Sequence, residues 1–256
     1  MKIIFLGTSG GISTQTRNVT SIGLQRDSGS WSMIDCGDGT TYQVARANWK
    51  LEMLDSIFIT HLHADHFFGI VSILFRKDMM RESCDLTLYA PKGMKKFIQN
   101  SLEITQKVFE NFHLTIVEIE EGMTIEGKEM KIEVLPMHHR ISCYGYYIEM
   151  ADKRVIIAGD NDNPEIMKNH LYTLDLWVHE ATFLDKEYTD KRKNSLHTTA
   201  KLLGEVADKY DVKWLIATHI SGRHQDKEGV KEIEDEIRLN YKNRLEIADD
   251  FDEFEV

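Results

Sequence analysis

The segment 61–66 is the feature that most constrains this chain of 256 residues, because it holds three histidines and one aspartate in the order H-x-H-x-D-H. It follows the apolar, β-branched run 57–60, which predicts a buried strand. Side chains at a strand end stay close together while pointing in different directions. One such histidine is typical of a polar loop, but four donors at this density favour two adjacent metal ions.

The first two histidines of the segment are expected to share one ion, and the last two donors to face a second. The four donors, in chain order, are His61, His63, Asp65 and His66. Imidazole nitrogen with carboxylate oxygen suits zinc, and also manganese or iron. The segment therefore predicts one half of a site for two Zn²⁺ ions, with Mn²⁺ or Fe²⁺ as alternatives.

Composition indicates a soluble globular protein, with 42% hydrophobic and 29% charged residues. The net charge of −11 and the sequence pI of about 5.5 give no sign of a basic nucleic-acid-binding surface. Nucleic acid is not excluded, because two bound dications add positive charge at the site itself.

Cysteine usage and the start of the chain predict a cytoplasmic protein without a membrane segment. Cys36, Cys84 and Cys143 are odd in number and form no C-x-x-C pair, which disfavours disulfides and thiolate zinc. The apolar start is too short for a signal-peptide core, and no apolar run reaches transmembrane length.

Strands come in consecutive groups with helices between them, which predicts an α/β four-layer αββα sandwich. With three prolines and no linker or repeat, residues 1–256 are expected to form a single domain. Helices are predicted over 42–48 with Thr40 as cap, and over 67–75, 93–107, 197–210 and 228–239. In the acidic tail, an edge strand is expected to turn Phe251 inward.

One pattern recurs along the chain: a β-branched strand ends and a His or Asp follows at once. Functional groups at the strand ends of an α/β domain usually meet in one site. The residues that show the pattern are His61, Asp160, His179 and His219. Asp160 follows a strand and a glycine, which favours a bridge between two ions, although an ordinary turn aspartate fits that context about equally well. His138 or His139 would complete the set.

Two ions would lower the pKa of a bridging water and clamp the oxygens of a phosphodiester or ester. The leaving alkoxide needs a proton donor, for which His197 oriented by Glu180 is the candidate. From spacing alone, a histidine at a helix start near a surface glutamate is the better interpretation of this pair.

The chain resembles ribonuclease Z (tRNase Z) of the metallo-β-lactamase fold from end to end. The matching motifs are 5–8, 17–21, 35–40, 60–66, 139–146, 159–160, 179–183, 197–200 and 219–223. The H-x-H-x-D-H element alone specifies the superfamily, whereas H-E-A-T-F and R-N-V-T-S are much narrower. The spacing of the third ligand motif selects His139 over His138.

The resemblance implies hydrolysis of a phosphodiester by metal-bound hydroxide, and a homodimer. It implies a first zinc ion held by the positions of His61, His63, His139 and Asp160. It implies a second ion held by those of Asp65, His66, Asp160 and His219. Asp65 would also be the general base, Glu180 with His197 the proton donor, and Ser221 and Arg223 would lie near the substrate phosphate.

The sequence departs from the family in the bridging-aspartate motif, in the loop after Gly69 and in a missing arm, and the missing arm concerns the substrate. The usual G-D-T-R-P reads Gly159-Asp160-Asn161-Asp162-Asn163-Pro164. The long arm that in the family follows the third motif and grips tRNA is missing, because only residues 146–159 separate Gly145 from Asp160.

The leading hypothesis is a zinc-dependent phosphodiesterase of ribonuclease Z type, with precursor tRNA 3′ ends as a candidate substrate. The alternative substrate is a small cyclic or nucleotide phosphodiester, which the missing arm and the acidic charge favour. A catalytically silent metal- or RNA-binding module is disfavoured because Asp65, Glu180 and His197 are all present. A lactamase or thioester hydrolase is disfavoured because the donor pair and Arg223 suit a phosphate ester.

Overall fold

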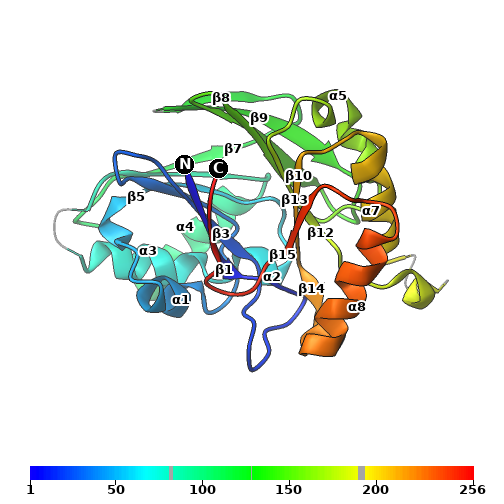
Figure 1. The fold of residues 1–256 in the computed structure, drawn as a ribbon. Coiled ribbons are helices and arrows are strands. Elements are labelled where there is room, and N and C mark those ends of the chain that lie inside the picture. Colours follow the sequence, from blue (N-terminus) through cyan, green and yellow to red (C-terminus); the bar gives the residue numbers. More distant parts are fainter. Residues whose placement is uncertain (81–82, 128, 190–193) are drawn as a thin grey trace.

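Two seven-stranded sheets lie face to face between two layers of helices (Figure 1). The structure, a computed structural model, describes residues 1–80, 83–127, 129–189 and 194–256. Figure 1 shows α1, α3 and α4 outside the first sheet and α7 and α8 outside the second. The four-layer αββα sandwich expected from the sequence is confirmed.

The first sheet has mixed strand directions and carries the segment 61–66 after its β5 strand. Its strands in spatial order are β16 (Glu253–Glu255), β1 (Lys2–Gly7), β3 (Ser21–Gln25), β4 (Trp31–Ile34), β5 (Leu54–Phe58), β6 (Leu86–Ala90) and β7 (Leu114–Glu118). Strands β4 to β7 are parallel to one another.

The second sheet brings three parallel strand ends together. Its strands in spatial order are β15 (Arg244–Ile247), β13 (Trp214–Thr218), β12 (Leu176–Glu180), β11 (Lys153–Ile157), β10 (Cys143–Met150), β9 (Met130–Met137) and β8 (Thr124–Gly127). Strands β11, β12 and β13 run parallel, so the residues that follow them meet at one edge. A small parallel pair, β2 (Ser9–Gly10) and β14 (Ile220–Ser221), lies beside that edge.

The helices lie in the two outer layers or in short connections. Within the described ranges they are α1 (Thr40–Arg46), α2 (Ala64–Phe67), α3 (Ile70–Asp78), α4 (Met94–Thr105), α5 (Lys168–Leu171), α7 (Ala200–Lys209) and α8 (Lys227–Arg238). Short 3-10 turns are η1 (Leu51–Met53), η2 (Pro164–Met167), η3 (Asp185–Glu187) and η4 (Gly222–His224). No helix among the described residues is long and apolar enough to cross a membrane.

Three apolar layers hold the sandwich together, one between the sheets and one under each helix layer. Between the sheets, Phe58 stacks on Tyr89 and meets Tyr146 edge to face. Burial of such large side chains contributes about 1.5–3 kcal/mol each. These layers make the strand ends a rigid support for the side chains that follow them.

The helix predicted over 67–75 is confirmed over 70–75, where it forms the first part of α3, but it does not begin at Phe67, because Phe67 ends the separate helix α2 and Gly69 lies between the two. A Cβ at this glycine would lie 2.1 Å from the Gly37 carbonyl oxygen. The Gly69 N–H donates to the Cys36 carbonyl at 2.9 Å, and the Cys36 N–H donates to the His66 carbonyl at 2.7 Å. The segment 61–66 is therefore held directly on the loop at 36–37.

Two smaller expectations also differ from the structure. Thr40 is the first residue of α1 rather than its cap, and its hydroxyl donates to the Gly37 carbonyl at 2.8 Å. In the tail, Phe254 of β16 turns inward against Phe5 and Trp214. Phe251 instead has a φ of 73° and lies under the Arg46 guanidinium.

Candidate metal centre

The site lies where strand ends of the two sheets meet. The segment 61–66 follows β5 of the first sheet, whereas Asp160, Glu180 and His219 stand at the ends of β11, β12 and β13. His139 follows β9. The structure thus brings together all seven metal ligands that the sequence predicted.

The first donor set consists of three imidazole nitrogens and one carboxylate oxygen. His61 Nε2 lies 3.0 Å from His63 Nδ1, which lies 3.1 Å from His139 Nε2. Asp160 Oδ2 lies 3.6 Å from His61 Nε2 and 3.8 Å from His139 Nε2.

The second donor set is more regular. His66 Nε2 lies 3.3 Å from His219 Nε2. Asp65 Oδ2 lies 3.4 Å and 3.5 Å from these two nitrogens. Asp160 Oδ1 lies 3.4 Å from each of them. Asp160 therefore presents one oxygen to each set.

These spacings fit a metal ion at the centre of each set. Four ligands about 2.0–2.1 Å from one zinc ion in a tetrahedron stand about 3.3–3.4 Å apart. The distances in the second set match that separation, and those in the first set scatter around it. Nitrogen and carboxylate donors of this kind suit a divalent metal, and both groups could hold one.

Asp35 orients His61 and His66 from the side of each ring that faces away from the donor sets. His61 Nδ1 donates to the Thr60 hydroxyl at 3.0 Å, and this hydroxyl donates to Asp35 at 2.8 Å. His66 Nδ1 donates to the same Asp35 oxygen at 2.7 Å. Such outer partners fix the tautomer that leaves Nε2 free to bind a metal.

Hydrogen bonds from the second-sheet side of the site orient His219 and His139 in the same way. His219 Nδ1 donates to the Thr182 hydroxyl at 2.9 Å, and Thr182 donates in turn to Glu180. His139 Nδ1 donates to the Leu196 carbonyl at 3.0 Å. The sequence did not single out Thr60 or Thr182, whose only signal is their place beside a ligand or the donor glutamate.

Backbone strain accompanies this network. Asp35, Leu196 and His219 have φ values of 57°, 55° and 56°, in the left-handed region that most side chains avoid. Strained residues of this kind persist where the surrounding structure holds them, often at functional sites. All three take part in orienting or forming the donor sets.

The charges of the site are strongly coupled. Burial lowers the pKa of His61. Burial also opposes protonation of His66, but Asp160, Asp35 and Asp65 outweigh it and raise the pKa of that histidine. Burial raises the pKa of Asp65, but His66 and His219 hold it well below its usual range. The Asp65 carboxylate therefore stays ionised, which favours binding of a cation.

The proposed proton-donor pair is brought together beside Asp160. His197 Nδ1 lies 3.0 Å and 3.2 Å from the two Glu180 oxygens and 3.6 Å from Asp160 Oδ2. The Asn161 N–H donates to Glu180 at 2.7 Å. Burial lowers the pKa of His197, but the charge of Glu180 and its hydrogen bond outweigh that and raise the pKa to about 9.

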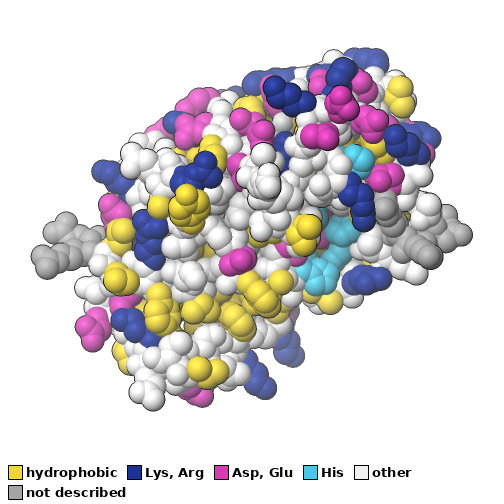
Figure 2. All heavy atoms as spheres, turned by 90° about the horizontal axis from the view of Figure 1, so that it is seen from below, with side chains coloured by type: hydrophobic (Ala, Val, Ile, Leu, Met, Phe, Trp, Pro, Cys, Tyr) yellow, Lys and Arg dark blue, Asp and Glu magenta, His cyan; other side chains and the backbone are white. Residues whose placement is uncertain are grey.

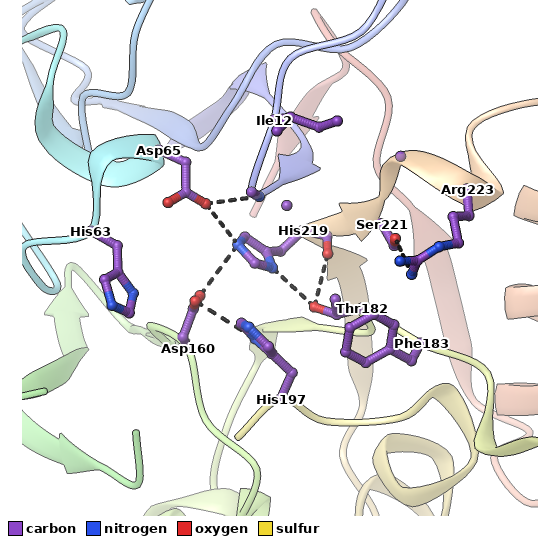
Figure 3. A pocket seen from close by; sticks show the side chains of 13 residues that line it. Ile12, His63, Asp65, Asp160, Thr182, Phe183, His197, His219, Ser221 and Arg223 are labelled. Atoms are coloured by element: carbon purple, nitrogen blue, oxygen red, sulfur yellow. Dashed lines mark hydrogen bonds and ion pairs between the residues drawn. The ribbon is translucent and has the colours of Figure 1, made fainter. Parts of the chain in front are cut away.

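A cleft of about 550 Å³ opens over the two donor sets. Figure 2 shows histidine side chains at the bottom of a hollow with Lys and Arg side chains near its edge. Figure 3 shows Asp65, Asp160, His197 and His219 converging on one side, with Ser221 and Arg223 facing them. Arg223 Nη1 donates to the Ser221 hydroxyl at 3.5 Å. Ile12 and Phe183, which sequence reasoning missed, also line the cleft.

Two histidines that the sequence analysis considered lie outside the donor sets, His179 of the strand-end pattern and His138, the alternative to His139. His179 is fully buried against Trp177, and its Nε2 lies 3.3 Å from the Asn161 amide. His138 is exposed and pairs with Asp162 at 2.5 Å. The structure brings His139 and not His138 into a donor set, in agreement with the spacing of the third ligand motif.

Comparison with known proteins gives a family match and full-length relatives. Residues 1–235 match the family model described as Anti-Pycsar protein Apyc1. Ribonuclease Z of Bacillus velezensis is 30% identical over 308 aligned positions, which cover 100% of this chain and 99% of that protein. The alignment is longer than the chain, so this relative carries additional residues.

Solved structures agree on the fold. Human tRNase Z, short form, superposes with a TM-score of 0.83 at 25% identity and covers 100% of this chain and 99% of that chain. The metallo-beta-lactamase fold protein YhfI from Bacillus subtilis has a TM-score of 0.83 at 18% identity, covering 99% and 98%.

Proposed function

The chain belongs to the ribonuclease Z family of metallo-β-lactamase-fold hydrolases and to the Apyc1 family, and we propose that it hydrolyses phosphodiesters with two divalent metal ions. It is a metal-dependent hydrolase of the nuclease and phosphodiesterase class. The first ion would be held by the donor set of His61, and the second by that of His66, with Asp160 shared. When bound, two such ions activate water and neutralise charge on phosphoryl oxygens.

One observation carries this proposal: the two oxygens of a single buried carboxylate, Asp160, face two separate donor sets. A single ion would need only one of those sets. We propose zinc in both, because three of the four donors in the first set are imidazole nitrogens. Manganese and iron also accept this ligand chemistry.

The residues around the sets supply the remaining parts of the reaction. Asp65 keeps its negative charge and can accept a proton from the attacking water. Its Oδ2 is held by the Gly11 N–H at 2.8 Å. Against the effect of burial, Glu180 raises the pKa of His197, which favours the protonated form that can donate to the leaving alkoxide. Ser221 and Arg223 face the donor sets across the cleft, where they can bind the phosphate oxygens.

We favour a small cyclic or nucleotide phosphodiester over precursor tRNA as the substrate. The observation is the connection between β10 and β11, which consists of Ala151 and Asp152 alone. The resemblance places the tRNA-gripping arm between the third ligand motif and Asp160, and this tight hairpin leaves no room for it. The net charge of −11 also disfavours a long nucleic-acid surface.

The second candidate is cleavage of precursor tRNA at its 3′ end. The names of the full-length relatives favour it, because they are ribonuclease Z and tRNase Z. The homodimer and the cytoplasmic location expected from the sequence remain proposals. Light scattering on the purified protein tests the first.

The function is tested with bis(p-nitrophenyl) phosphate. We expect turnover with metal present, loss of turnover after chelation, and recovery when zinc or manganese is restored. Metal content measured on the same sample should approach two ions per chain. An absence of turnover on this ester, on cyclic nucleotides and on precursor tRNA at full metal content would contradict the proposal.

The substrate is tested by comparing kcat/KM on a cyclic mononucleotide and on a precursor tRNA. We expect the cyclic mononucleotide to be the better substrate. A higher kcat/KM on the tRNA would favour the second candidate.

A further inference from the structure

The consecutive residues Arg223, His224 and Gln225 lie at the rim of the cleft, and each side chain contacts a different part of the molecule. Arg223 faces the cleft, His224 contacts the loop at 184–187, and Gln225 contacts the loop at 9–14. We propose that His224 and Gln225 are positioning residues that join the two loops and hold Arg223 at the distance from the donor sets that a phosphodiester requires. This inference rests on the proposed function.

The first contact ties the rim to the loop after β12. His224 is 7% exposed, and its Nε2 lies 2.5 Å from Glu187 Oε2. The same carboxylate oxygen accepts from the Leu184 N–H at 3.3 Å, directly after Phe183 of the cleft wall. On the other side, a Cβ at Gly229 would lie 2.5 Å from His224 Cα, so α8 packs against this backbone. His224 is therefore fixed from two directions.

The second contact ties the rim to the loop before the donor sets. Gln225 Nε2 donates to the Ser9 hydroxyl at 2.6 Å, and its Oε1 accepts from Thr14. Ser9 begins β2, which ends at Gly10, and Gly11 follows. Gly11 donates to Asp65, and a Cβ at Gly10 would lie 2.7 Å from the His219 ring. Gln225 therefore fixes the loop that touches two ligands of the second donor set.

Arg223 stands between these two ties with an exposed side chain. An arginine side chain loses conformational entropy when it binds a phosphate. If its backbone were also mobile, binding would have to order the backbone too, so a fixed backbone limits the entropy cost of binding. Loss of either tie would let the rim move away from the donor sets. Binding would then weaken, while the proton donor His197, which Glu180 holds, would stay in place.

The test measures kcat and KM on bis(p-nitrophenyl) phosphate for His224→Ala, Gln225→Ala and Arg223→Ala. We expect the first two to raise KM about three- to tenfold and to leave kcat within about twofold, as for lost binding shared by ground and transition states. His224→Gln should largely restore KM, because its amide can donate to Glu187. The double variant Arg223→Ala, His224→Ala should be no worse than Arg223→Ala, because residues that act through one another are not additive.

Two further readouts do not depend on turnover. Binding of inorganic phosphate to the zinc-loaded protein, measured by calorimetry, should weaken in the same variants. Hydrogen exchange at 183–188 should speed up in His224→Ala. If wild-type protein fails to turn over any ester, the proposed function fails, and these two measurements still decide the inference.

The matched control is His170→Ala, which removes a histidine–glutamate pair with Glu133 at 3.3 Å outside the cleft. Glu187→Ala breaks the same tie from the other side and serves where His224→Ala folds poorly. The inference is overturned if His224→Ala behaves like His170→Ala, or if its effect on KM multiplies with that of Arg223→Ala.

Discussion

The two donor sets share Asp160 but differ in regularity and exposure. The second set has donor separations of 3.3–3.5 Å, and its histidines are buried and held by Asp35 and Thr182. The first set spans 3.0–3.8 Å and includes the half-buried His63 at the floor of the cleft.

The difference shows where the fold has fixed its ligands in advance. Buried carboxylates hold both histidines of the second set, Asp35 directly and Glu180 through Thr182, whereas in the first set Asp35 reaches His61 through Thr60. We infer that the second set is preorganised, whereas the first set, which opens to substrate, adjusts when an ion binds. Each prediction below tests one part of this contrast.

The largest effect is expected for Asp160→Asn, which neutralises the one group that both sets share. Metal content should fall in both sets, and kcat should drop by at least about a thousandfold because the metal-assisted reaction is lost. Elemental analysis and turnover measure the two outcomes. Asp162→Asn, which neutralises a carboxylate paired with the exposed His138, is the control. Retention of two ions by Asp160→Asn would show that the sets are independent.

The next effect separates the two sets by their histidines. His66→Ala leaves Asp35 buried without its charged partner and should destabilise the metal-free protein by about 2–4 kcal/mol. His63→Ala removes a half-buried side chain and should cost about 1 kcal/mol or less. Urea unfolding of the metal-free variants measures both. Equal losses would remove the contrast in preorganisation.

The part of the site that the sequence could predict is local or follows from strand ends. The segment 61–66 holds four donors within six consecutive residues. Asp160 and His219 follow β-branched strands that run parallel, so their position at a common edge is a property of the fold. His179 fits the same pattern but lies within β12 rather than after it. The alternation of side chains along the strand therefore directs His179 toward the core.

The rest depends on contacts between distant segments, which no local pattern encodes. Asp35 meets His66 across 31 positions of the chain, and Thr182 meets His219 across 37. At Gly69, between α2 and α3, the backbone N–H donates to the Cys36 carbonyl, a contact between segments 33 positions apart. In the tail, two phenylalanines three positions apart both fit an edge strand, and pairing with β1 selects Phe254.

A smaller effect is expected for Asp35→Asn, because this residue contacts no substrate and acts behind both sets. It accepts from the Thr60 N–H and hydroxyl and from His66, and an amide cannot accept all three bonds equally well. Metal affinity should fall about 10- to 100-fold, as for other outer partners of metal ligands. Competition with a chelator measures it. Asp38→Asn, an exposed change in the same loop, should leave affinity unchanged.

The smallest effect concerns the titration of His197 in the metal-free protein and its contribution to the pH dependence of stability. Glu180 and Asp160 oppose the effect of burial and raise the pKa of His197 from its ordinary 6.5 to about 9. Because the folded pKa is the higher one, protonation of His197 stabilises the fold fully below pH 6.5. This contribution is lost as the pH rises through 9. Glu180→Gln should move the His197 titration, followed by NMR, down toward its ordinary value and flatten that part of the stability profile.

This last change also bears on the contrast between the sets. His197 lies 3.6 Å from the Asp160 oxygen that faces the first set, whereas Glu180 reaches the second set through Thr182 and His219. If Glu180 only orients the donor, Glu180→Gln should shift the His197 titration and leave metal affinity in both sets unchanged. If metal affinity falls in the second set alone, Glu180 also belongs to the network that preorganises that set, which the bond from Thr182 leads us to expect.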